Sequence, residues 1–212
     1  ATISTMAVLS IGVLSCVSAL KMFGNDRLVF WREASAGISI TAYWLAVTLM
    51  HLPLTLIFSF LFVAPYYNLI LPDVTFLDVW WVFIAVHFAC SGGGMLLSVV
   101  FKPIPALLCG VMIPLIIGGF LNGVSPPLKD MGSVMTFLCD LSYSRYGVEA
   151  LMIQQLDVQP DYADTLVNDI YSQFGFMKTH FRFAVGMLFT IGCVMRVLTL
   201  FALHGLNRDK RV

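Results

Sequence analysis

The sequence predicts an all-α fold, a polytopic bundle of transmembrane helices. Hydrophobic residues make up 59% of the 212 residues and charged residues 11%, with a mean hydropathy of +0.89. Soluble domains usually carry about a quarter charged residues. The apolar residues stand in long unbroken runs, whereas a membrane β-barrel shows alternating segments of about ten residues. We therefore expect helices that cross a bilayer.

Five apolar runs approach or exceed the roughly 20 residues that a membrane-spanning helix needs. They lie at about residues 2–23, 40–70, 79–101, 104–124 and 181–203. The second run is too long for a straight crossing, so we expect it to tilt or to break near Pro53 or Pro65. No repeat or linker divides the chain, which predicts one membrane domain over residues 1–212.

The chain begins within apolar sequence, without a Met or a basic n-region, so we expect a fragment rather than a signal peptide. Basic residues favour one set of span ends: Lys21, Arg27, Arg32, Lys102, Arg208, Lys210 and Arg211. Because short basic loops mark the cytoplasm, we expect residues 24–39, the Lys102 turn and the C-terminus to face inward. Residues 71–78 and 125–180 then lie outside.

The outer segment, residues 125–180, is the longest stretch without a span. Residues 141–156 follow a helical pattern in which Arg145 and Glu149 are four apart and can pair. A second amphipathic helix is predicted from apolar residues at helical spacing, namely Ala163, Leu166, Val167, Ile170, Tyr171 and Phe174. Cys139 is the one cysteine in this segment, and it either is buried or pairs with a second chain.

A charged segment interrupts the apolar sequence between the first two spans, with Asp26, Arg27, Arg32 and Glu33. Asn25 or Asp26 can cap a short helix that carries Leu28, Trp31 and Ser35 on one side. Two interpretations stay open on these residues alone. The helix lies on the lipid headgroups, or it is a coupling element pressed on a partner whose movement it transmits.

The remaining motifs favour structural roles. Gly92, Gly93 and Gly94 lie within a span and no G-K-[ST] follows, so we interpret them as packing glycines and not as a phosphate loop. His51 and His87 have no second ligand at helical spacing, so no metal site is expected. They either bond to a neighbouring helix or act in function. Arg196 is expected to snorkel or to meet a carboxylate. A net charge of zero suggests no nucleic-acid partner.

Five motifs in order resemble the membrane domain of the G subfamily of ATP-binding cassette (ABC-2 type) transporters. "VSALKMFGNDRLVFWREASAG" is similar to the junction between the second span and the first intracellular helix of that family. "AYWLAVTLMHLP" resembles the opening of its third span and "IIGGFLNGVSPP" the end of its fifth. "LSYSRYGVEALMI" resembles its external re-entrant region and "HGLNRDKR" its basic tail.

The resemblance implies that the chain holds spans two to six of a six-span domain, without the nucleotide-binding domain. The charged segment is then the cytoplasmic coupling helix that rests on the ATPase, with Arg27, Trp31, Arg32 and Glu33 as its candidate residues. ATP and Mg are expected at the absent domain, not in this fragment. The implied partners are that domain, a second transporter half as homo- or heterodimer, and membrane lipids. The implied location is the plasma membrane.

The resemblance also implies a substrate path between two copies, lined by the second and fifth spans of each. The matching positions are Ser10, Leu14, Met112 and Leu115, with Phe120 and Leu121 as a hydrophobic gate. Leu14 stands where a multidrug-exporting relative has an aromatic residue, which argues against stacking of flat drugs. His51 stands where many relatives carry an acid.

The function implied is ATP-driven movement, in the export direction, of lipids, sterols or other amphipathic compounds. The fragment has no ATPase site, and the full protein is expected to be an ATP-hydrolysing translocase. Two alternatives stay open. One is a non-transporting membrane scaffold or receptor whose outer loop binds a partner. The other is a proton-coupled secondary carrier that uses His51 or His87, although such carriers often show internal repeats and this sequence has none.

Overall fold

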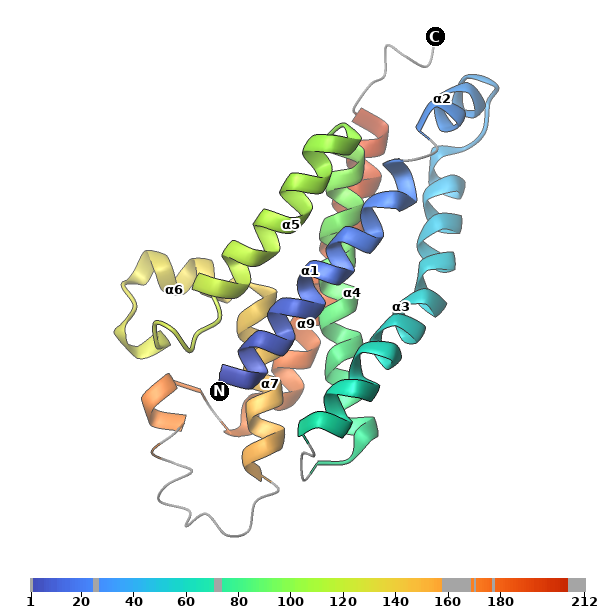
Figure 1. The fold of residues 1–212 in the computed structure, drawn as a ribbon. Coiled ribbons are helices and arrows are strands. Elements are labelled where there is room, and N and C mark those ends of the chain that lie inside the picture. Colours follow the sequence, from blue (N-terminus) through green and yellow to red (C-terminus); the bar gives the residue numbers. More distant parts are fainter. Residues whose placement is uncertain are drawn as a thin grey trace.

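The computed structural model describes residues 2–24, 27–70, 74–157, 169, 171–176 and 178–205. Within these ranges the chain is built from helices and their connections, which confirms the predicted all-α bundle (Figure 1). Five helices are long and apolar enough to cross a membrane: α1 (Thr2–Gly24), α3 (Ile40–Ile70), α4 (Phe76–Val100), α5 (Pro103–Phe120) and α9 (Phe181–Gly205).

The short helices gather at the two ends of this bundle. One lies between α1 and α3: α2 (Arg27–Ser35). Between α5 and α9, the elements with described bounds are η1 (Leu128–Asp130), α6 (Ser133–Asp140), α7 (Tyr143–Asp157) and η2 (Lys178–His180), and residues 171–174 are helical as well. Figure 1 shows α2 at the same end as the start of α5 and the end of α9, while α6 and α7 lie at the other end. This alternation agrees with the expected topology. The cytoplasmic assignment of the α2 end stays a prediction.

Helix α4 is the centre of the bundle, because it packs against α1, α3, α5, α7 and α9. It is apolar on nearly every face, the pattern of a helix surrounded by other helices rather than one at a surface. Val82, Phe83 and Val86 are fully buried in it. They join a core that extends into α1 through Val8 and Ile11.

Glycines let the helices beside α4 approach closely. A Cβ at Gly94 would meet the Cβ of Ala19 on α1 at 2.9 Å, and one at Gly192 on α9 would overlap the ring of Phe88 on α4. Small residues are how membrane helices gain packing contacts in the absence of a hydrophobic driving force between them. The expectation that Gly92 and Gly94 are packing glycines is therefore confirmed, whereas a Cβ at Gly93 meets nothing within 4 Å.

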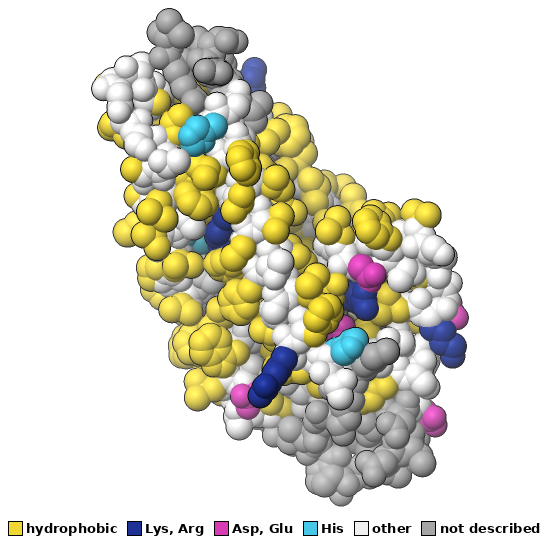
Figure 2. Space-filling model, turned by 180° about the vertical axis from the view of Figure 1, so that it is seen from behind, with side chains coloured by type: hydrophobic (Ala, Val, Ile, Leu, Met, Phe, Trp, Pro, Cys, Tyr) yellow, Lys and Arg dark blue, Asp and Glu magenta, His cyan; other side chains and the backbone are white. Residues whose placement is uncertain are grey.

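Outside the core, the spans present apolar side chains to their surroundings. Figure 2 shows hydrophobic side chains covering most of one face between its two ends. Helices α3 and α5 contribute many of the exposed large apolar residues, among them Leu49, Leu61, Leu108 and Ile116. A surface of this kind on a monomer is suited to lipid tails or to another protein, not to water.

Helix α3 covers the predicted residues 40–70 and stays helical through Pro53 and Pro65, and Figure 1 shows it changing direction midway, so this long span bends rather than breaks. Two other helix boundaries differ from the sequence prediction by three residues or more. Helix α4 begins three residues early, at Phe76, because the Thr75 hydroxyl accepts the N–H of Asp78 as a cap. Helix α5 ends at Phe120, four residues early, where Gly123 takes a φ of 75°.

The outer segment also differs from its predicted pairing. Helix α7 covers the predicted residues 141–156 almost completely, but Arg145 pairs with Asp140 and not with Glu149. Glu149 instead faces His180, with 3.8 Å between Oε1 and Nδ1, which joins α7 to the start of α9. The second predicted helix, with Ala163, Leu166 and Val167, falls mostly outside the described residues.

Replacing Gly94 by Ala is expected to destabilise the bundle by about 1–3 kcal/mol, because the added methyl group pushes α1 away from α4. The matched control is Gly93→Ala, one residue away, where the methyl group meets open space. That control should leave stability equal or raise it by up to about 1 kcal/mol, since Ala favours a helix over Gly. Thermal unfolding of the full-length protein in detergent measures both. Equal midpoints for the two variants would contradict this packing.

Candidate functional site

The four predicted substrate residues lie on two helices that pack together, α1 and α5. Ser10 and Leu14 are one turn apart on α1 and both are exposed, Leu14 by 59%. Met112 and Leu115 lie one turn apart on α5, and Met112 is 53% exposed. The described chain therefore leaves both pairs uncovered on an apolar surface. It does not enclose the four residues in one cavity.

Helices α1 and α5 meet through small residues. A Cβ at Gly110 would overlap Leu20, and one at Gly118 would press on Leu9 at 3.1 Å. Pro114 lies between these two glycines within α5. A helix-interior proline removes one backbone hydrogen bond, which loosens the helix at that point. The α1–α5 contact is therefore close at two points, with a weakened turn between them.

The predicted gate residues lie where α5 ends. Phe120 is 63% exposed, while Leu121 is half-buried and its carbonyl oxygen accepts the Cys139 thiol at 3.4 Å. Cys139 is itself fully buried, which favours the structural alternative over a bond to a second chain. Burial also raises the pKa of its thiol above the ordinary value, so the thiol stays protonated.

Asn122 holds the turn after the gate in one geometry. Its Nδ2 donates to the carbonyls of Gly118 and Gly119, at 3.1 and 2.9 Å. Its Oδ1 accepts the N–H groups of Val124 and Ser125, at 2.8 and 2.9 Å. Asn122 is not among the residues predicted from the sequence, although an Asn-Gly dipeptide directly after an apolar run is a recognisable turn signal.

Tyr143 connects the outer helices to the substrate helices. It projects from the start of α7, and its hydroxyl donates to the carbonyl of Pro114 at 3.1 Å. Gly12 and Gly118 leave the room for its ring and hydroxyl. Burial holds the pKa of the Tyr143 phenol well above its ordinary value, so it remains a donor. Only the tertiary fold brings these residues together.

At the other end, α2 is attached to the bundle through Phe30. The Phe30 ring stacks on Tyr43 of α3 with 4.6 Å between centroids, and Phe23 of α1 meets the same Tyr43 edge-on at 5.8 Å. The sequence pattern places Leu28, Trp31 and Ser35 on one side of this helix. Of these, Trp31 is half-buried, Ser35 is exposed, and the Leu28 side chain is not among those described.

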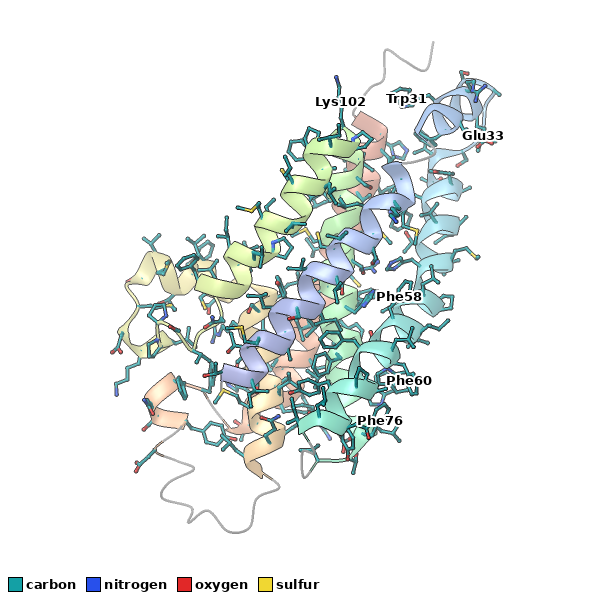
Figure 3. The ribbon with its side chains drawn as sticks, viewed as in Figure 1. Trp31, Glu33, Phe58, Phe60, Phe76 and Lys102 are labelled. Atoms are coloured by element: carbon teal, nitrogen blue, oxygen red, sulfur yellow. The ribbon has the colours of Figure 1, made fainter. Side chains whose placement is uncertain are left out.

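The predicted coupling residues lie beside this attachment. Figure 3 shows Trp31 and Glu33 at the same end of the molecule as Lys102. Arg32 is exposed and Glu33 is half-buried, while the side chain of Arg27 is outside the described set, as are Asn25 and Asp26. The helix ends in a Schellman motif, in which Ile38 N–H donates to Glu33 O at 3.1 Å around Gly37, at φ 98°. The turn from α2 into α3 is therefore well defined.

Arg196 forms the main polar link inside the bundle. Its Nη1 donates to the carbonyls of Phe88 and Gly192, at 2.7 and 3.1 Å, and its Nη2 donates to Ser91 Oγ at 3.0 Å. The guanidinium also lies 3.7 Å from the centre of the Phe88 ring. The expected snorkelling or carboxylate partner is wrong for the described part of the chain. The buried guanidinium instead bonds to carbonyls and a hydroxyl.

The two intramembrane histidines lie near one another. The His51 and His87 ring centroids are 6.1 Å apart, and His51 Nδ1 bonds with Thr55 Oγ1 at 3.2 Å. Both side chains are buried, and the structure gives the Nε2 atom of neither one a hydrogen-bond partner among the described residues. These two nitrogens are the strongest unexplained polar feature of the spans.

Two cavities adjoin this region. One, of about 380 Å³, lies between α1, α3 and α4 and is lined by Leu14 and His87 among others. The second, of about 230 Å³, lies between α1, α4, α5, α7 and α9, beside Pro114 and Tyr143. Both walls are mainly apolar. Each wall is suited to the apolar part of a ligand.

A sequence profile described as "ABC-2 type transporter" matches residues 1–209 of this chain. The chain belongs to the ABC-2 type transporter family. The match covers every span and both ends of the bundle, so it confirms the resemblance on which the expected coupling helix and substrate path were based. The individual residues assigned to those two sites stay predictions.

Plant members of the G family are among the relatives of this ABC-2 domain. "ABC transporter G family member 28" of Arabidopsis thaliana is 28% identical over 149 residues, 70% of this chain. "ABC transporter G family member 25" of Oryza sativa subsp. japonica is 30% identical over 146 residues, 69% of this chain. "Putative white-brown complex homolog protein 30" of Arabidopsis thaliana is 25% identical over 150 residues. The aligned part spans only 13–14% of these proteins.

Changing Arg196 to Lys is expected to lower stability by about 1.5–3 kcal/mol, because an ammonium group does not reproduce the fork of hydrogen bonds to α4. Arg182→Lys makes the same chemical change at an exposed position on the same helix. It should shift stability by no more than about 0.5 kcal/mol. Thermal unfolding of the full-length protein provides the comparison. An unchanged unfolding midpoint for Arg196→Lys would show that the Arg196 hydrogen bonds do not stabilise the contact between α9 and α4.

Proposed function

We propose that this chain forms most of the membrane domain of an ATP-driven transporter of the G subfamily, one that exports lipids, sterols or other amphipathic molecules and works as a dimer. The observation that carries the proposal is the family match over residues 1–209. The five apolar spans support it as well. The names of the plant relatives state that they are ABC transporters of the G family.

The residues described here do not fit ATP or Mg. Gly92, Gly93 and Gly94 lie inside helix α4 with no Lys after them, so they form no phosphate-binding loop. In this proposal, ATP hydrolysis belongs to a nucleotide-binding domain outside residues 1–212. The role of this chain is to receive the movement of that domain and convert it into a change at the substrate path.

The substrate path in this proposal runs along the uncovered α1–α5 face. Leu14, Met112 and Leu115 offer apolar contacts and Ser10 offers a hydroxyl, all exposed in the isolated chain. A second transporter half closes this face and completes the path. Phe120 and Leu121 stand at its outer end, where Asn122 fixes the turn that carries them.

The coupling element in this proposal is α2. Its Phe30 ring stacks on Tyr43 of α3, which also meets Phe23 of α1, and its Arg32 is exposed, so it is accessible to a partner outside the bundle. The Schellman turn fixes the junction between α2 and α3. A displacement of α2 therefore moves the neighbouring ends of α1 and α3 together. Trp31 and Glu33 are half-buried, so they lie between the side of α2 that packs on the bundle and its exposed side.

The double variant Met112→Ala/Leu115→Ala is expected to weaken substrate binding, because it removes apolar contacts worth about 1–3 kcal/mol, or roughly 10-fold or more. The measurement is ATP turnover of the full-length protein in nanodiscs, titrated with an amphipathic substrate. The half-maximal substrate concentration should rise. Leu49→Ala/Leu52→Ala on α3 has the same spacing and exposed leucines, and it should leave that concentration unchanged.

Substrate-stimulated turnover by the wild type supports the transporter. Turnover that no amphipath stimulates, together with capture of a partner by the outer segment, would instead support a scaffold. Equal responses of the two double variants would move the substrate path away from α5.

Phe30→Ala is expected to uncouple ATP turnover from substrate binding, because α2 then loses its stacking contact with α3. Basal ATP turnover should persist while its stimulation by substrate falls, by roughly 10-fold if about 1.4 kcal/mol of coupling is lost. Val29→Ala truncates an exposed apolar side chain on the same helix and serves as the control. Equal stimulation in both variants would show that α2 is not the coupling element.

A further inference from the structure

The cavity between α1, α3 and α4 has the form of a lateral ligand site. Its volume is about 380 Å³, within the range of small-molecule pockets. Leu14 and Ser18 line it from α1, Phe58 and Leu61 from α3, and His87 from α4. Figure 3 shows Phe58 midway between the two ends of the bundle. Because Leu14 and Leu61 are both largely exposed, the cavity is open to the side.

His87 is the most deeply buried polar side chain in the lining of this mainly apolar cavity. His87 is 3% exposed, and no described residue bonds to its Nε2. Phe58 lies over the imidazole, with 6.3 Å between ring centroids and 19° between planes. An unpaired polar atom is costly in a bilayer core, where water does not satisfy it. A ligand whose polar end reaches His87 removes that cost.

The charge behind His87 indicates the kind of polar end. The Arg196 guanidinium donates to the carbonyl of Phe88, the residue next to His87 on α4. All of its hydrogen bonds in the structure go to neutral acceptors, and the ion pairs found in the described residues do not include it. Both His51 and His87 lie within its electrostatic range. A positive charge without a carboxylate partner among the described residues therefore lies behind His87, outside the cavity lining itself.

We infer that this cavity binds an anionic amphipath, a long-chain carboxylate whose head group lies against His87 and whose tail lies between α1 and α3. The Nε2–H of the neutral imidazole donates to a carboxylate oxygen, and the guanidinium behind it stabilises the negative charge. An alcohol of equal chain length makes the hydrogen bond without the charge interaction, and an amine is repelled. That this ligand is also cargo rests on the proposed function. Its binding does not.

The test uses the full-length protein in detergent without ATP. A C16 carboxylate carrying a diazirine on its tail is photo-crosslinked, and the labelled peptides of α1 and α3 are quantified by mass spectrometry. Palmitate, hexadecanol and hexadecylamine compete with the probe. Palmitate should compete at least about 10-fold better than hexadecanol, the effect of about 1.4 kcal/mol. Equal competition by palmitate and hexadecanol would overturn the charge argument.

Two variants test the position of the site. His87→Phe keeps an aromatic ring but removes Nε2, the donor that palmitate and hexadecanol share, so labelling by the carboxylate probe should fall, whereas His204→Phe at an exposed position should retain it. Leu61→Trp fills the cavity from an exposed position that tolerates bulk, and it should reduce labelling about 10-fold. Leu69→Trp, on the same helix and 83% exposed, is its control. Labelling that survives both His87→Phe and Leu61→Trp would refute the site.

The readouts also separate this inference from the proposed function. Carboxylate binding that depends on His87, without any amphipath-stimulated ATP turnover, supports the site and contradicts the transporter. Stimulated turnover without carboxylate labelling supports the transporter and contradicts the site.

Discussion

The close contact of α4 with α1 and α9 is the constraint on which the rest of the bundle depends. Lipid tails are as apolar as the helix surfaces, so these helices gain little from leaving lipid and must gain it from close packing and from hydrogen bonds. Gly94 and Gly192 allow the approach, and Arg196 then reaches the carbonyl of Phe88 across the contact. Packing and polar bonding support each other, because the guanidinium reaches its acceptors only when the helices are this near.

The outer helices are built onto this core and act on the substrate helices. Tyr143 reaches from α7 to the carbonyl of Pro114, the residue that weakens α5. Asn122 and the Cys139–Leu121 contact then fix the end of the same helix. A displacement of α7 therefore moves the proposed gate and the proline-weakened turn together, whereas the α2 end of the bundle is held separately through Tyr43.

Two routes to the membrane interior follow from this arrangement. The α1–α5 face is uncovered and carries no buried charge, which suits apolar cargo between two transporter halves. The α1–α3 cavity ends on His87 in the field of Arg196, which suits a ligand with a negative head. Leu14 borders the lateral cavity while belonging to the predicted substrate face, so a single helix, α1, separates the two sites.

Sequence by itself determined the spans, their alternation and the helical outer segment. The physical reason is that a bilayer core requires long apolar runs, and that basic residues gather in the loops at one set of span ends. It also placed Trp31, Arg32 and Glu33 on a short helix at one end. Tertiary structure decided the rest. Arg145 pairs with Asp140 instead of Glu149, and Arg196 bonds to carbonyls on α4, because partner choice depends on which helix faces lie together. Helical periodicity predicts which residues share a face of a helix, but the residues that this face contacts depend on how the helices pack.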